Sequence, residues 1–105
     1  MKDDSFKEFV LDQLRELEGT DARRMFSGYG LYYRGTFFGI ISKNNLYFKT
    51  DEQSRSDYIA EGMGPFVPSA KQTLKNYYEV PPDIIEDREK LAAWARRAAA
   101  VNQKP

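Results

Sequence analysis

Carboxylates are the side chains of this sequence that could most readily do chemistry, and they gather in two stretches, residues 51–61 and 83–89. A pair of carboxylates can hydrolyse a glycosidic bond, and a cluster of them can bind a hard metal ion. These residues fall at the starts and on the polar faces of expected helices, where capping and solvation account for them. We therefore predict no catalytic and no metal-binding site among them: Asp51, Glu52, Asp57, Glu61, Asp83, Glu86, Asp87 and Glu89.

Missing residue types narrow the chemistry further. The chain contains no histidine and no cysteine, so it lacks the side chain best suited to proton transfer near neutral pH and the thiolate used as a nucleophile. Gly28-Tyr29-Gly30 lacks the further glycine of a dinucleotide-binding loop, and no Gly-Lys-Ser/Thr element follows it. We expect no cofactor and no enzymatic activity. An enzyme would need a concave pocket that brings carboxylates to Tyr29 or Lys49.

Two pairs of adjacent arginines are the candidates for phosphate contacts: Arg23, Arg24, Arg96 and Arg97. With nearby lysines they would form a basic patch if the ends of the fold lie together. The sixteen basic residues are balanced by sixteen acidic ones, so the chain as a whole lacks the positive field that attracts nucleic acid. Interaction with a helix dipole and pairing with carboxylates explain the arginines better than phosphate binding does. Direct nucleic-acid binding stays an open alternative.

Tyrosines and phenylalanines recur along the strand-like segments between residues 29 and 78. Packing in the core is the usual role of such rings. A sheet covered by helices on one face would still leave some tyrosines on the other face, where large amphipathic rings favour protein contacts. Base stacking is the weaker interpretation, because the RNP signature of the common RNA-binding module is absent. We predict an interaction surface among Tyr29, Tyr32, Tyr33, Tyr47 and Tyr77.

The first half of the chain predicts one helix followed by a four-stranded meander. Ser5 and Glu8 have the Ser-x-x-Glu spacing of a helix start. From residue 22 the pattern changes to short β-branched and aromatic runs, with Arg34-Gly35 and Asn44-Asn45 as tight turns. We expect a helix over residues 6–18 and strands over 22–27, 30–34, 37–42 and 45–49.

Turn residues divide the second half of the chain. Gly64-Pro65 and Pro68 interrupt regular structure across residues 62–70, and Pro81-Pro82 ends the segment that follows. We expect a helix over 52–61, a strand over 73–80, one helical turn at 83–86 and a helix over 88–101. The predicted fold is α+β and two-layered, with an antiparallel, mostly meander sheet of about five strands, helices on one face, and the order α-β-β-β-β-α-β-α.

Length and hydropathy limit the organisation of the chain. A chain of 105 residues is long enough for one compact core and short for two, so we expect a single domain over residues 1–105. No apolar run approaches the roughly 20 residues that span a bilayer. The acidic N-terminus is followed by an amphipathic segment rather than a signal sequence. We expect a cytoplasmic protein without membrane association.

Several ordered blocks are typical of one protein family. They are Met25-Phe26-Ser27-Gly28-Tyr29-Gly30, Leu46-Tyr47-Phe48-Lys49, Gly62-Met63, Pro65-Phe66, Tyr78-Glu79-Val80-Pro81 and Trp94-Ala95. Over about residues 22–100 they resemble the N-terminal domain of the TfoX/Sxy family, bacterial proteins associated with regulating competence for DNA uptake. The family's usual pattern has glycine where this chain has Ser27, a substitution compatible with the fold.

The resemblance implies an α+β two-layer domain without established catalytic residues, found in regulators that act with the transcription machinery. Family regulators of competence also carry a C-terminal helical domain, and we expect this chain to be the N-terminal domain alone. We predict a regulatory domain that works by contact with a protein partner, through an exposed aromatic sheet face or a strand edge. The partner implied by the resemblance belongs to the transcription machinery, and a homodimer formed through the same surface is a further expectation.

Two other functions stay open. The first alternative is a nucleic-acid-binding accessory domain that uses the four arginines named above to bind phosphates. The second is a small-ligand module or an enzyme, which would need the carboxylate-lined pocket described above.

Overall fold

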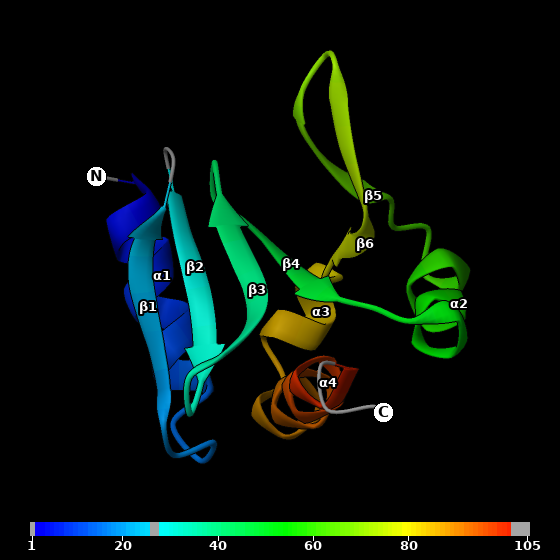
Figure 1. Cartoon of the computed structure of the whole chain (residues 1–105). Coiled ribbons are helices and arrows are strands. Elements are labelled where there is room, and N and C mark those ends of the chain that lie inside the picture. Colours follow the sequence, from blue (N-terminus) through cyan, green and yellow to red (C-terminus); the bar gives the residue numbers. More distant parts are fainter. Residues whose placement is uncertain (1, 26–27, 102–105) are drawn as a thin grey trace.

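The sequence folds into one antiparallel sheet with helices on one of its faces (Figure 1). The computed structural model describes residues 2–25 and 28–101. The elements follow one another as α1 (Lys2–Gln13), β1 (Thr20–Met25), β2 (Gly28–Tyr33), β3 (Thr36–Ser42), β4 (Asn45–Lys49), α2 (Glu52–Ala60), β5 (Pro65–Ser69), β6 (Gln72–Glu79), α3 (Pro82–Ile85) and α4 (Arg88–Val101). The predicted α+β, two-layer fold is confirmed, with a sheet of six strands in place of the expected five.

The strand order in the sheet is β1-β2-β3-β4-β6-β5. The first four strands form the predicted meander, and its hairpins use positive-φ turns. Arg34 and Gly35 have φ of 50° and 86°, and Lys43 and Asn44 have φ of 51° and 64°, which suits a two-residue hairpin loop. The second turn lies one residue earlier than the predicted Asn44-Asn45, because Asn45 already pairs with β3.

All four helices bury apolar side chains against the same face of the sheet. α1 lies against β1 and β3, α4 against β3 and β4, and α2 against β6. A single hydrophobic core joins Val10 of α1, Tyr58 of α2, Ile84 of α3 and Leu91 of α4 to the sheet. Within the described residues, no helix packs on the opposite face, which we call the helix-free face.

Two predicted elements differ from the observed ones. α1 begins at Lys2 and ends at Gln13 instead of spanning 6–18, so Ser5 lies inside the helix and its predicted capping role is wrong. β5 was not predicted, because Pro65 and Pro68 argue against a strand. Proline is nevertheless tolerated on an edge strand, where no ladder donor is needed, and β5 is such an edge.

The remaining element predictions hold closely. The last helix is confirmed over residues 88–101, and the third strand and the second helix fall within one residue of their predicted bounds. The first strand begins at Thr20 rather than at residue 22, and the end predicted for it, residues 26–27, lies outside the described residues. No helix in the described part of the chain has the length and apolar character needed to cross a bilayer.

Candidate interaction surface on the helix-free face

Strand alternation decides which side chains point away from the helices. In β2, Leu31 is fully buried in the core, so its neighbour Tyr32 points to the helix-free face. Directly paired residues share a face, and the register carries this assignment across the sheet. The helix-free face therefore includes Arg23, Met25, Tyr32, Phe37, Ile40, Tyr47 and Tyr77.

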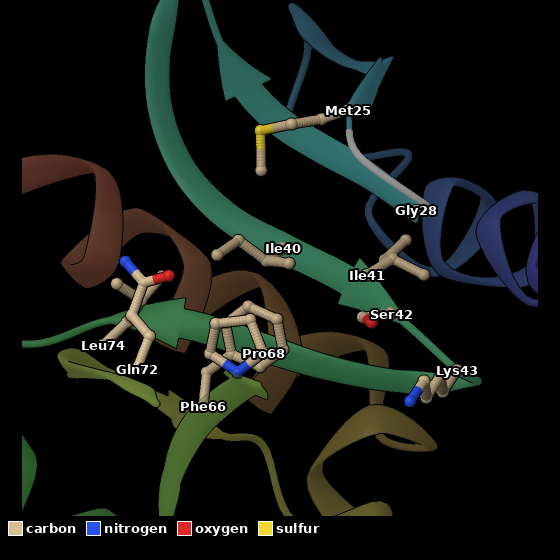
Figure 2. Close-up of a pocket in the computed structure, with 10 residues that line it drawn as sticks. All are labelled: Met25, Gly28, Ile40, Ile41, Ser42, Lys43, Phe66, Pro68, Gln72 and Leu74. Carbon is tan, nitrogen blue, oxygen red and sulfur yellow. The ribbon is translucent and has the colours of Figure 1, made fainter. Parts of the chain in front are cut away.

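A groove runs between this face and the β5–β6 hairpin (Figure 2). Met25 and Ile40 line it from the sheet, and Phe66, Pro68 and Leu74 line it from the hairpin. The groove has a volume of about 420 Å³, within the roughly 300–1,000 Å³ usual for ligand pockets. The walls thus come from two segments far apart in the sequence, and they are mainly apolar.

Glycines let the sheet side of the groove pack tightly. A Cβ atom on Gly28 would lie 2.0 Å from the carbonyl oxygen of Ile41. A Cβ on Gly30 would lie 3.0 Å from the Phe37 ring and 3.2 Å from the Met25 sulfur. Since both positions lack a side chain, β2 and β3 approach closely and the larger side chains lie over the strands.

Three rings form a row on the helix-free face, and a further ring pair lies at the groove. The ring centroids of Tyr32 and Phe37 are 5.3 Å apart, and those of Phe37 and Tyr77 are 5.6 Å apart. Tyr47 packs on Phe66 at 4.5 Å and so links the sheet to the hairpin. These distances are typical of favourable tilted ring pairs, and they hold the surface in one shape.

Burial affects the ionisation of two tyrosines on this surface. Burial raises the pKa of both Tyr47 and Tyr77 above the ordinary 10.0, so both hydroxyls stay protonated near neutral pH. Among the described residues that line the groove, Lys43 is charged and none is acidic. The combination of carboxylates with Tyr29 or Lys49 that an enzyme would need is not assembled in this groove.

A protein-family model matches the part of the chain that forms the sheet and the groove. The family model described as the TfoX N-terminal domain matches residues 12–101. This chain belongs to that family. The match includes all six strands and every residue of the groove, and it confirms the resemblance found in the sequence blocks. No curated protein matches the chain significantly.

The five tyrosines predicted as an interaction surface divide between the two faces of this TfoX N-terminal domain. Tyr32, Tyr47 and Tyr77 lie on the helix-free face. Tyr29 is 8% exposed and belongs to the core cluster, and Tyr33 packs against that cluster from the same face. The structure therefore brings three of the five tyrosines to one surface.

Tyr29 forms a polar cluster with α1. Its hydroxyl donates a hydrogen bond to the Asp4 carboxylate, and this bond lowers the pKa of Asp4 and raises the pKa of Tyr29. The Lys7 ammonium and the Arg24 guanidinium lie 5.0 Å and 5.3 Å from the centre of the Tyr29 ring. These contacts connect the first turns of α1 to β1 and β2.

The four arginines predicted as phosphate contacts have separate surroundings in the TfoX N-terminal domain. Arg23 covers Tyr32 on the helix-free face, at 4.4 Å from the ring centre, whereas Arg24 contacts Tyr29 on the helix side. On α4, Arg97 pairs with Asp57 at 2.7 Å. Arg96 lines a different hollow beside Arg34, about 420 Å³ in volume.

The apolar residues that make the groove were not predicted from the sequence. Phe66, Pro68 and Leu74 belong to a hairpin whose first strand was not predicted. Met25 and Ile40 were part of predicted strands, but the face to which they point depends on the register. A usable signal was present in Pro65-Phe66-Val67-Pro68, where apolar residues lie between two prolines, because strands accept proline at a sheet edge.

Proposed function

We propose that this TfoX N-terminal domain is a non-catalytic regulatory module that binds a polypeptide partner in the groove of the helix-free face. The observation that carries the proposal is the groove itself, with apolar walls from the sheet and from the β5–β6 hairpin. When a partner's apolar side chains pack against such walls, both apolar surfaces are removed from water, and this stabilises the complex. The groove has no acid–base pair among its described lining residues, which favours occupancy over chemistry.

The sheet edges support a contact by the face rather than by strand addition. Pro65 and Pro68 stand on the edge strand β5, where they cannot donate a backbone hydrogen bond to an added strand. The other edge, β1, carries Asp21, Arg23 and Arg24, and charged side chains discourage edge pairing. Of the two contact modes expected from the sequence, the sheet face is therefore favoured.

Family membership supports the regulatory part of the proposal. The resemblance to TfoX/Sxy regulators makes a component of the transcription machinery the expected partner. The domain would act by occupying a site on that partner or by holding it in place, since neither role requires bond chemistry.

Position-specific crosslinking tests the proposed function. Leu74 lines the groove and is replaced by photoreactive benzoylphenylalanine. Val67 provides the matched control, because it lies on the same hairpin, is 54% exposed and does not line the groove. Both proteins are irradiated in native lysate, with and without nuclease, and the crosslinked peptides are sequenced by mass spectrometry.

The proposal predicts a nuclease-resistant adduct at position 74 that contains one defined partner peptide, and little or none at position 67. Equal adducts at both positions would refute the groove as the contact surface. An adduct that disappears after nuclease treatment would contradict the polypeptide partner.

A further inference from the structure

Charge is divided unevenly between the two layers of this neutral chain. Residues 20–49, which form β1–β4, contain five basic residues and one acidic residue, and residues 62–80, which hold the β5–β6 hairpin, contain two lysines and one glutamate. These two segments together carry a net charge of +5. Because the whole chain is neutral, the remaining, mainly helical segments carry −5.

Several of the basic side chains stand around the groove. Lys43 lines one end of it (Figure 2). Lys71 is exposed beside the lining residue Gln72. Arg23 shares the helix-free face with the groove residue Met25, but there it lies 3.8 Å from the carboxylate of Asp21. An apolar groove with cations at its rim favours an occupant that carries anionic groups beside its apolar side chains.

We propose that the groove binds an acidic, apolar polypeptide segment. Large apolar side chains of that segment would enter the groove, and flanking aspartates or glutamates would face Lys43 and Lys71. The inference rests on the proposed function and adds the chemistry of the partner. It predicts an affinity that depends on salt, because charges at a solvent-exposed rim are screened by ions.

The same observations favour a polypeptide over nucleic acid. Among the described residues that line the groove, Phe66 alone carries an aromatic ring, and that ring packs against Tyr47 at 4.5 Å. In the adjacent ring row, Phe37 packs between Tyr32 and Tyr77 at interplanar angles of 43° and 41°. Single-stranded nucleic acid requires ring faces open to successive bases, whereas these rings are turned toward one another.

Three fluorescent 12-residue peptides test the proposal by anisotropy. They share a Phe-x-x-Leu core and differ only in flanks of Asp/Glu, Lys or Ser/Gly. At 0.1 M salt the acidic peptide should bind about tenfold more tightly than the lysine peptide, and the difference should shrink at 1 M salt, where the Debye length falls from about 10 Å to about 3 Å. An oligo(dT) of about 12 nucleotides that carries the same fluorescent label serves as the nucleic-acid probe.

A charge-reversal variant gives the sharper comparison. Aspartate tolerates the positive φ of 51° found at this turn, so Lys43→Asp suits the backbone there. The variant should bind the acidic peptide about fivefold more weakly and the lysine peptide more tightly. Lys90→Asp is the matched control, because Lys90 is exposed on α4, away from the groove. The control should leave all three affinities within about twofold.

The other outcomes overturn the proposal in distinguishable ways. Equal binding of the three peptides, with loss of binding in Leu74→Glu, would refute the acidic preference and leave the groove as the contact site. Peptide binding that Leu74→Glu does not weaken would refute the groove as well, and with it the proposed function. Competition by oligo(dT) at similar concentrations would assign the surface to nucleic acid. A dimer in sedimentation that Leu74→Glu dissociates would assign the groove to a second copy of the chain.

Discussion

Gly28 occupies a position where the sheet leaves no room for a side chain. A Cβ atom there would lie 2.0 Å from the Ile41 carbonyl oxygen, and a backbone atom in a paired strand cannot move aside without breaking the ladder. We predict that Gly28→Ala lowers the free energy of unfolding by about 3 kcal/mol, measured by urea denaturation. Gly64→Ala is the control, since its Cβ would meet nothing within 4 Å. Equal stability of the two variants would contradict this description of the β2–β3 contact.

The buried hydroxyl of Tyr58 makes the stability of the domain depend on pH in the alkaline range. It is 1% exposed and packs against Trp94 at 4.7 Å, and burial raises its pKa above the ordinary 10.0. The unfolded chain therefore releases this proton near pH 10 while the folded chain retains it. This contribution to stability is complete below pH 10 and is lost as pH rises toward the folded-state pKa, at up to about 1.4 kcal/mol per pH unit.

Tyr58→Phe tests this linkage. The variant lacks the ionisable hydroxyl, so its unfolding free energy should fall less between pH 9 and pH 11 than that of the wild type, by about 1 kcal/mol. Urea denaturation at the two pH values measures the difference. Parallel losses in the two proteins would mean that other groups cause the alkaline sensitivity.

At the scale of elements, α1 is joined to the α3–α4 corner by a buried amide. The Gln13 side chain donates a 2.9 Å hydrogen bond to the Ile85 carbonyl and accepts a 3.1 Å bond from Arg88. The Arg88 guanidinium also forms a 2.9 Å ion pair with the carboxylate of Asp12, which directly precedes Gln13. The end of α1 is thus held by contacts that span more than 70 residues of sequence.

We predict that Gln13→Ala destabilises the fold by about 2 kcal/mol, because the Ile85 carbonyl would remain buried without this donor. Gln53→Ala on the exposed surface of α2 is the matched control and should change stability by less than about 0.5 kcal/mol. Thermal or urea unfolding of both variants measures the difference. A Gln13 variant as stable as its control would show that the corner is held by apolar packing alone.

Most elements could be predicted from local patterns, and the failures have physical causes. Leu91, Ala95 and Ala98 recur at helical spacing and are all buried, so the last helix was identified at both ends. The edge strand with Pro65 and Pro68 was missed, because only its place at the sheet margin makes prolines acceptable there. The start of α1 was placed too late, because Ser5 and Glu8 match a capping pattern that the helix does not use.

The candidate site was harder to predict than the fold, because it depends on register and on hairpin position. The spacing of the tyrosines could not separate Tyr32, on the helix-free face, from Tyr29, which is fixed to Asp4 beneath α1. That assignment needs the alternation within β2 and the pairing across it. The groove also needs the hairpin to lie opposite Ile40, which no local pattern encodes.

At the scale of the whole molecule, net charge concealed the separation of charge between layers. Sixteen basic and sixteen acidic residues cancel, yet fourteen of the acidic residues lie outside the two segments that form the sheet. The total charge governs solubility and long-range attraction, whereas the partner would meet only one face. The central claim is therefore that the helix-free face is the contact surface of this TfoX N-terminal domain.

Backbone amide NMR during titration with the acid-flanked peptide tests that claim most directly. The account predicts chemical-shift changes that concentrate at Met25, Ile40, Lys43, Phe66 and Leu74, with the outer surfaces of α1 and α4 unchanged. The Leu74→Glu protein should lose these changes, and the Val67→Glu protein should keep them. Shifts that concentrate on the helices or along the free edge of β1 would contradict the account.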